Sequence, residues 1–343
     1  MQTVTAWAPG RVNLIGEHLD YNGGHCLPIA IGLGTTATVT RSSGPDHLLR
    51  SDVEPDGWTA YVRGVLTSLG VTEPLEVSIT SDLPIGAGLS SSAALECSVA
   101  LAVDTLLGLH LERENLLAAC VRAENEYVGV PSGGMDQAAS LFASAGSGLL
   151  LDFADGSRRE VPLDLAGYCL LVVDTRVSHA LTDGGYAARA ADCAAAAAEL
   201  DVPYLARATG AQIDSLTDPR VRRRARHVVS EQARVESFVT AAARGRWHTA
   251  GAMMTASHRS LREDFEVSCP ELDAVVEAAL AAGARGARMT GGGFGGSAVV
   301  LAPSSSVDTV GEAVRRRFAE NEWDAPTVFV VEASRGAQVL SAT

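Results

Sequence analysis

The sequence contains no lysine, and all 27 residues of its lysine-plus-arginine total are arginine. This absence excludes the lysine of a Walker A loop, the strand lysine of a protein kinase and the Schiff-base lysine of a pyridoxal phosphate enzyme. An enzyme of this composition that handles ATP must hold its phosphates with backbone amides, hydroxyl groups, arginine and magnesium.

Basic charge is also scarce overall. The chain has 41 acidic residues, a formal net charge of −14 and a pI near 5.0. A nucleic acid or an anionic membrane needs a basic face, so we expect neither as a partner. The arginine-rich stretch 220–226 has no interleaved aromatic residues, and we expect it to be a solvated helix face.

Long hydrophobic runs are missing too. No apolar run is long enough to cross a bilayer. Residues 1–10 lack the basic start and apolar stretch of a signal peptide, so we expect a cytoplasmic protein. The six cysteines are dispersed without CxxC or metal-ligand spacing, which favours reduced thiols packed in the core.

The apolar pattern predicts a mixed α/β chain. Strands are indicated at 35–41, 75–80, 148–153, 168–174 and 297–301. Helices are predicted at 90–107, 111–129, 135–143, 186–200, 219–244, 246–262 and 271–282. A length of 343 residues favours two domains or one large unit. A composition shift near 155–166 leads us to expect domains at 1–165 and 166–343.

Polar side chains crowd into the segment 10–22. Val12, Leu14 and Ile15 are typical of a short buried strand, which Gly16 breaks just before the polar cluster. Loops held by a rigid element are where binding residues tend to lie. A polyhydroxylated ligand needs many converging donors and acceptors, whereas a solvated turn is the alternative. The polar residues are Arg11, Asn13, Glu17, His18, Asp20 and Asn22.

A glycine- and serine-rich loop at 84–93 leads directly into the predicted helix 90–107. Gly86 and Gly88 let the backbone approach an anion, and the helix start supplies free amides and positive dipole density. An ordinary serine N-cap is the alternative, but it needs one serine and this loop has three, Ser90–Ser92. The loop therefore predicts phosphate binding.

Two carboxylates stand out on predicted helices. Glu124 falls on the apolar face made by Leu117, Cys120 and Val121, where an unpaired charge is costly to bury. The alternative is that Glu124 lies at the edge of that face and reaches water. Asp136 falls in the first turn of a helix, where capping is an equally good interpretation.

The glycines at 291–296 match G-x-G-x-x-G by count alone. A dinucleotide site needs a following helix, but a strand-like run follows here, so the Rossmann interpretation fails.

Several of these segments together resemble the galactokinases of the GHMP family of small-molecule kinases. The similar stretches are GRVNLIGEHLDYNGG at 10–24, PIGAGLSSSA at 84–93, VPSGGMDQ at 130–137 and MTGGGFGG at 289–296. WTAYVRG at 58–64, the segment 177–189, and the stretches 225–235 and 257–273 extend the likeness over nearly the whole chain. Ser132 and Gly134 depart from the cysteine and isoleucine usual in the third motif, which implies a looser pocket wall.

The resemblance implies an α/β (α+β) two-domain GHMP fold. Its N-terminal domain would be of the ribosomal-protein-S5-domain-2-like type, its C-terminal domain of the ferredoxin-like type, and its active site would lie between them. The implied activity is ATP-dependent phosphorylation of the anomeric C1 hydroxyl of α-D-galactose, which gives galactose 1-phosphate and ADP in the Leloir pathway. Galactose and ATP are then the partners, with Mg²⁺ as cofactor, and we expect a monomer.

The family's roles carry over to matching positions. Arg11 and Asp136 become the catalytic pair, Glu124 and Ser92 the magnesium ligands, and Ser91 a possible substitute for Ser92. Sugar binding is implied for Glu17, His18, Asp20, Gly133, Asp136 and Tyr186. Nucleotide binding is implied for Trp58, Gly86, Gly88, Leu89, Ser90, Ser91, Ser92 and Ala93; core packing is the alternative for Trp58.

Two alternatives remain open. One is another GHMP sugar-1-kinase, acting on an N-acetylated hexosamine or a pentose. The other is a non-catalytic galactose and ATP sensor, which the intact Ser92-Ala93 pair disfavours because known sensors of the family lose it.

Overall fold

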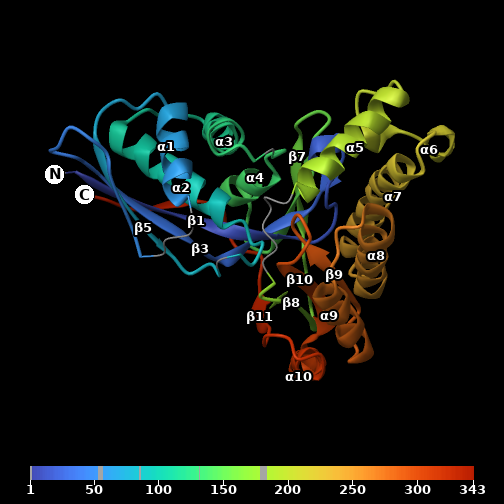
Figure 1. Ribbon diagram of the computed structural model, residues 1–343. Coiled ribbons are helices and arrows are strands. Elements are labelled where there is room, and N and C mark those ends of the chain that lie inside the picture. Colours follow the sequence, from blue (N-terminus) through green and yellow to red (C-terminus); the bar gives the residue numbers. More distant parts are fainter. Residues whose placement is uncertain (1, 53–56, 85, 131, 178–183) are drawn as a thin grey trace.

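The computed structural model describes residues 2–52, 57–84, 86–130, 132–177 and 184–343. These residues form three sheets with helices packed against them, in a body elongated along the first sheet (Figure 1). Within the described ranges, no helix is long and apolar enough to span a membrane.

The first sheet is mostly antiparallel and contains both ends of the described chain. Its strands lie in the order β12 (Gln338–Ala342), β1 (Thr3–Asn13), β3 (Pro28–Arg41), β5 (Leu75–Ser81) and β4 (Leu48–Ser51). The register between β1 and β3 shifts between Pro9 and Arg11, where one residue of β1 lies opposite three residues of β3, 31–33. The irregularity faces the start of residues 10–22, called here the signature segment, whose first charged residue is Arg11.

Helices cover one face of this sheet (Figure 1). Their side chains share an apolar core with residues of β1, β3 and β5. These helices are α1 (Trp58–Ser68), α2 (Ser91–Leu107), α3 (Arg113–Arg122) and α4 (Met135–Phe142). Alanine, leucine and valine dominate α2, and most of its residues are buried because it packs between the sheet and its helical neighbours.

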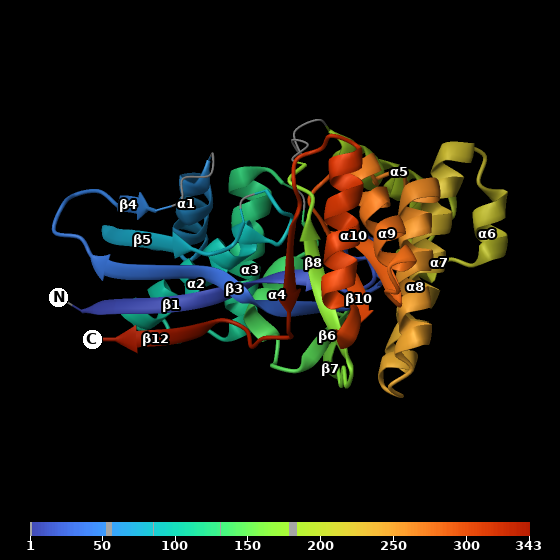
Figure 2. The same ribbon diagram turned by 90° about the horizontal axis from the view of Figure 1, so that it is seen from below.

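The other two sheets lie farther along the molecule (Figures 1 and 2). One has the order β2 (His25–Cys26), β6 (Ser147–Asp152) and β7 (Arg158–Pro162). The other has the order β11 (Thr327–Val331), β8 (Tyr168–Asp174), β10 (Ser297–Pro303) and β9 (Gly286–Thr290). Around them pack α5 (Gly185–Glu199), α6 (Gly210–Ser215), α7 (Pro219–Ala242), α8 (Trp247–Ser260), α9 (Pro270–Ala281) and α10 (Val307–Glu320).

Several sequence predictions need correction. The strand expected at Val12–Ile15 is the end of β1, which begins at Thr3, while Leu14 and Ile15 are buried beyond it. The helix predicted over 111–129 divides into α3 and a π-helical turn, η2 (Ala123–Val128). Another π-helical turn, η5 (Leu261–Phe265), follows α8. π-Helical turns are rare and concentrate at functional sites. The apolar spacing of the sequence did not predict either of these turns.

The arginine run on α7 is not entirely solvated. Arg224 has only 2% of its surface exposed and pairs with Glu266 and, at 3.7 Å, with Asp192. The solvated-face prediction is therefore wrong for this residue, because the run spans more than one face of the helix.

Candidate active site

Arg11 and Asp136 form a bidentate ion pair. Arg11 comes from β1 and Asp136 from the first turn of α4. Nε and Nη2 of Arg11 donate to Oδ1 and Oδ2 of Asp136 at 2.7 and 2.6 Å. Burial disfavours the charge on Arg11, but the nearby carboxylates of Asp136, Glu17 and Asp20 outweigh it and raise the arginine pKa. Asp136 keeps a quarter of its side chain exposed, so a ligand can reach it.

The predicted phosphate loop is attached to this pair. Ser90 precedes α2 at φ 60° and makes no side-chain cap; its hydroxyl donates to Asp136 instead. Arg11 Nη1 donates to the carbonyl of Gly88 at 2.8 Å, and its backbone amide donates to the carbonyl of Leu89 at 3.1 Å. The ordinary N-cap interpretation is therefore wrong for Ser90.

The loop has an unusual backbone. Gly86 and Gly88 have φ values of 75° and 71°, in the left-handed region that favours glycine. Ser91 is exposed at the start of α2, while Ser92 is half-buried and Ala93 is buried. Ile85 of this motif lies outside the described residues. The glycines and the helix start together present backbone and hydroxyl groups beside Asp136.

Asp136 does not cap its helix. The N-cap of α4 is Gly134, and the cap makes no side-chain hydrogen bond. Since both Asp136 oxygens accept from Arg11 or Ser90, the capping alternative from the sequence is wrong.

Glu124 lies in η2 and is 7% exposed, so the prediction that it is buried is confirmed and the edge-of-face alternative is wrong. Its Oε1 accepts from Ser92 Oγ at 3.1 Å, and its Oε2 accepts from Gln137 Nε2 at 2.6 Å. Burial raises the pKa of Glu124, and the charge of Asp136 adds to that effect. A bound cation would offset both the burial of Glu124 and the charge of Asp136.

A hydroxyl and a carboxylate are hard oxygen ligands of the kind that Mg²⁺ accepts together with substrate phosphates. The Ser92–Glu124 pair fits that requirement. In the described part of the chain, no group of three or more histidine, cysteine, aspartate or glutamate side chains is arranged to hold a metal ion. A metal at this pair would therefore depend on oxygens of the substrate.

The sequence did not single out Glu96 and Gln137. Glu96, on α2, is fully buried and accepts from Gln137 Nε2 at 2.9 Å. Burial, with the nearby charge of Glu124, raises the pKa of Glu96 to about 10, so it is neutral at physiological pH. The available signal was an acidic residue one helical turn after Ser92, within an otherwise apolar helix.

The signature segment places Glu17 deep in the site. Its carboxylate accepts from the Gly291 amide at 2.6 Å and from the Asn13 side chain, and it lies 3.6 Å from Arg288. Burial raises the pKa of Glu17, although Arg288 and Arg11 oppose that effect.

His18 follows at a φ of 64°, which is uncommon for a residue other than glycine. Its Nδ1 shares a hydrogen bond of 2.9 Å with the Tyr21 hydroxyl. Burial lowers the pKa of His18 to about 3, so the imidazole is neutral. Its ring lies 5.5 Å from that of Tyr186, which starts α5, and 4.5 Å from that of Phe265.

Asp20 faces Gly133, in the segment before α4. The Gly133 amide donates to Asp20 Oδ2 at 3.3 Å. A Cβ at Gly133 would lie 2.6 Å from that oxygen, so the close approach requires glycine. Burial raises the pKa of Asp20 to about 6, and the charge of Asp136 contributes. Pro131 and residues 178–183, which include part of the 177–189 match, lie outside the described residues.

Trp58 begins α1 and is 9% exposed within the apolar core shared with α2. The core-packing alternative therefore describes its surroundings. The glycine-rich segment 291–296 joins β9 to β10, so a strand follows it, as expected, where a dinucleotide site would need a helix. It lies against the phosphate loop: Ser297 Oγ donates to the Ala87 carbonyl at 2.6 Å, and a Cβ at Gly291 would lie 3.2 Å from the Gly88 carbonyl.

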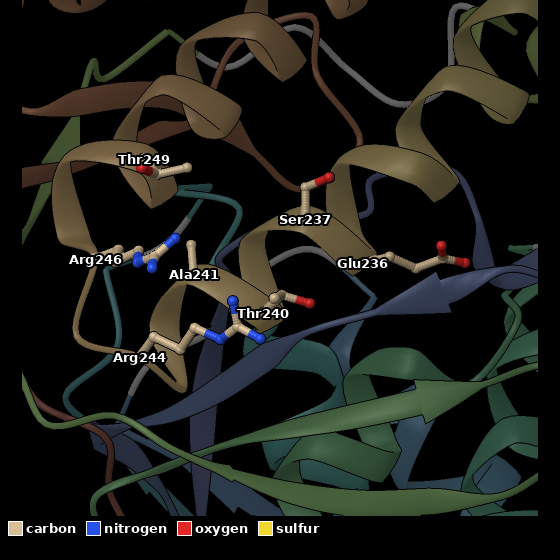
Figure 3. A pocket seen from close by; sticks show the side chains of 7 residues that line it. All are labelled: Glu236, Ser237, Thr240, Ala241, Arg244, Arg246 and Thr249. Atoms are coloured by element: carbon tan, nitrogen blue, oxygen red, sulfur yellow. The ribbon is translucent and has the colours of Figure 1, made fainter.

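A separate hollow of about 320 Å³ lies where α7 ends and α8 begins (Figure 3). None of the predicted site residues line it. Its walls are Glu236, Ser237, Thr240, Ala241, Arg244, Arg246 and Thr249.

Comparisons with known proteins identify the chain's family. Residues 2–41 match the galactokinase galactose-binding signature, residues 60–144 the GHMP kinases N-terminal domain and residues 238–320 the GHMP kinases C-terminal domain. A galactokinase of Streptomyces coelicolor is 46% identical over 97% of this chain and 93% of its own length. The chain belongs to the galactokinases of the GHMP kinase family.

Other galactokinases agree. That of Mycobacterium tuberculosis is 42% identical over 98% of this chain and 99% of its own length. The crystal structure of Lactococcus lactis galactokinase complexed with galactose superposes with a TM-score of 0.93 at 32% identity, covering 98% of this chain and 95% of that one. The L. major mevalonate kinase, at 22% identity and a TM-score of 0.69, shares the fold. The family and the α/β class expected from the sequence are confirmed.

Proposed function

We propose that this galactokinase transfers the γ-phosphoryl group of ATP to the anomeric C1 hydroxyl of α-D-galactose, giving galactose 1-phosphate and ADP. The observation that carries the proposal is the junction of Arg11, Asp136 and Ser90. It joins a reachable carboxylate, a fixed positive charge and the start of a phosphate loop.

In the proposed reaction, the C1 oxygen attacks the γ-phosphorus and the bond from that phosphorus to the β–γ bridging oxygen breaks. Asp136 accepts the hydroxyl proton or orients that hydroxyl. Arg11 holds the Asp136 carboxylate in place through its two hydrogen bonds, and its permanent charge offsets charge on the transferring group. Phosphoryl transfer depends mainly on positioning and charge neutralisation, which such an arrangement supplies.

The sugar would lie between the signature segment and the start of α5. We propose that Glu17, His18 and Asp20 bind its hydroxyls together with Gly133, Asp136 and Tyr186. We propose that Asp20 is the main residue that distinguishes the configuration of the sugar. The hydrogen bond from the Gly133 amide, which fixes the Asp20 carboxylate, supports this role.

The ATP phosphates would lie on the loop that leads into α2. We propose that Gly86, Gly88 and Leu89 contribute backbone groups, that Ser90–Ser92 contribute hydroxyls, and that Ala93 adds to the helix start. Ser92 and Glu124 would hold Mg²⁺, which supplies charge neutralisation to the phosphates when bound. Trp58 would lie near the adenine. A cytoplasmic location and a monomeric state remain predictions from the sequence.

Release of ADP, measured against a panel of hexoses, N-acetylated hexosamines and pentoses, tests this function. We expect turnover with galactose to exceed that with every other sugar. Higher turnover with an N-acetylated hexosamine or a pentose would indicate another GHMP sugar-1-kinase. ATP binding without turnover on any sugar would indicate a sensor.

A further inference from the structure

Arg288 contacts Asn13 and Glu17 of the signature segment from a strand that is distant in the sequence. It lies on β9, near the glycines 291–296, and is fully buried. Its Nη1 donates to the Asn13 carbonyl at 3.0 Å and lies 3.6 Å from Glu17 Oε1. Its Nη2 lies 3.9 Å from Glu231 Oε1. One guanidinium therefore lies near two fully buried carboxylates.

The second carboxylate is fixed in place. Glu231, on α7, accepts from the Gly16 amide at 3.0 Å and from Ser257 Oγ at 2.6 Å. Arg234 donates to its other oxygen at 2.6 Å. Although burial disfavours the charge, Arg234 and the other cations lower the pKa of Glu231 to about 2. Glu231 therefore has a closer cation in Arg234, whereas Arg288 is the main cation that opposes the effect of burial on Glu17.

The contact between Arg288 and Glu17 acts mainly through charge. At 3.6 Å it is longer than an ordinary hydrogen bond. Nε and Nη2 of Arg288 have no hydrogen-bond partner among the described residues. A guanidinium retained only to hold segments together would be expected to use these donors. Its position between two buried carboxylates indicates that Arg288 serves as a source of positive charge.

We infer that Arg288 is a positioning residue for galactose binding, which fixes the Glu17 carboxylate beneath the sugar and favours its charged form. This inference rests on the proposed sugar-binding role of Glu17. A buried carboxylate is stable in its charged form when a cation and hydrogen bonds compensate it. Arg288 supplies the cation, and Gly291 and Asn13 supply the hydrogen bonds.

A double-mutant cycle tests the inference with Arg288→Met, Glu17→Gln and the combined variant, in the full-length protein. The quantities measured are the KM for galactose, the KM for MgATP, kcat and the thermal midpoint of unfolding. Arg285→Met is the matched control, since Arg285 is exposed just before β9. We expect Arg288→Met to raise the galactose KM by on the order of tenfold or more, with the MgATP KM nearly unchanged.

The two substitutions should also be strongly non-additive, because each removes the same interaction. An increase of both KM values by equal factors, or additive effects in the double variant, would overturn the inference. If Arg288→Met does not fold, Arg288→Lys takes its place. It retains the charge on a different head group and should raise the galactose KM less than Glu17→Gln does.

The outcomes separate this inference from the proposed function. An unchanged galactose KM in Glu17→Gln would remove Glu17 from sugar binding and the inference with it. A raised galactose KM in Glu17→Gln with none in Arg288→Met would overturn the inference alone. Addition of guanidinium ion to Arg288→Gly, at a non-denaturing concentration, should lower its galactose KM, while sodium ion should not.

Discussion

Burial gives the acidic side chains of the site different charge states at one pH. It raises the pKa of Asp20 to about 6 and that of Glu96 to about 10. Groups whose environments separate their pKa values in this way can take different roles in one site. Asp20 then acts as an ionised acceptor at neutral pH, whereas Glu96 stays a neutral acid.

Galactose recognition should therefore fail in mildly acidic solution. Because the pKa of Asp20 is raised to about 6, the residue is protonated below that pH and loses its charge as an acceptor. We expect kcat/KM for galactose to fall as the pH drops through about 6, while the KM for MgATP changes little. Initial rates across pH, with each substrate varied in turn, measure this.

The same shift has a consequence for stability. A carboxylic acid whose pKa is raised in the folded state favours folding below its ordinary value of 3.8, and that contribution is lost as the pH rises through about 6. Asp20→Asn should therefore raise the thermal midpoint at pH 7. A midpoint at pH 7 equal to that of the unaltered chain would contradict the shift.

Asp136→Asn tests the residue at the centre of the proposed reaction. We expect kcat to fall by about 10²–10⁴-fold, the range typical of a lost general base. Asp214→Asn is the control, because Asp214 is exposed on α6 and should leave kcat unchanged. Near-normal turnover in Asp136→Asn would remove Asp136 from catalysis.

Most candidate residues were predictable one by one, because polar groups at apolar or glycine-rich positions are conspicuous. Arg288 was not, since a single arginine in a short strand has no pattern around it. The role of Arg288 is apparent only from its contacts with Glu17 and Glu231. These residues are distant from it in the sequence and lie near it only in the folded protein.

Among the elements, η2 has the clearest consequence for metal binding. Glu124→Gln should raise the Mg²⁺ concentration needed for half-maximal activity, because an amide oxygen binds the cation more weakly than a carboxylate. Glu126→Gln is a matched control on the same turn, where Glu126 is exposed. Magnesium titrations at fixed galactose and ATP measure the effect, and equal requirements in both variants would remove Glu124 as a ligand.

The loop before α4 offers a steric test. Gly133→Ala would bring a Cβ within 2.8 Å of the Asp20 Cβ, an atom that cannot move without its backbone. We expect the galactose KM to rise by roughly 5- to 150-fold, since such a steric overlap costs about 1–3 kcal/mol. Gly32→Ala is the control, because a Cβ there meets nothing within 4 Å. Equal galactose KM values in the two variants would contradict the close approach.

Elements with one strong signal were predicted well. The apolar run of β8 was located at both ends, and the helix predicted from residue 219 begins there, at Pro219 of α7. The first strand was largely missed because Pro9 and Gly10 interrupt its pattern, and pairing along β3 maintains it. That pairing is a long-range property, which local spacing does not reveal.

At the scale of the whole molecule, β12 joins the C-terminal end of the described chain to the first sheet. It pairs with Val4–Trp7 of β1. Deleting 338–343 exposes that edge and removes its backbone hydrogen bonds, each of which contributes about 0.5–1.5 kcal/mol. At about 2–4 °C per kcal/mol, we expect the thermal midpoint to fall by several degrees. Aggregation should increase because β1 becomes an open edge. Calorimetry and light scattering measure both.

The KM for galactose should stay unchanged in that deletion, because β12 pairs with the half of β1 that precedes Arg11. Leu340→Ser is the control, since Leu340 is exposed and the strand is kept. A midpoint equal to that of the control would show that β12 does not stabilise the sheet.

The place of β12 beside β1 also fixes an order of events during translation (Figure 2). The ribosome makes β1 first and β12 only after the strands of the other two sheets. At ordinary rates of synthesis, β1 waits tens of seconds for this partner. The nascent chain therefore carries one unpaired edge of β1 through almost its entire synthesis, and such an edge is a template for pairing with another chain.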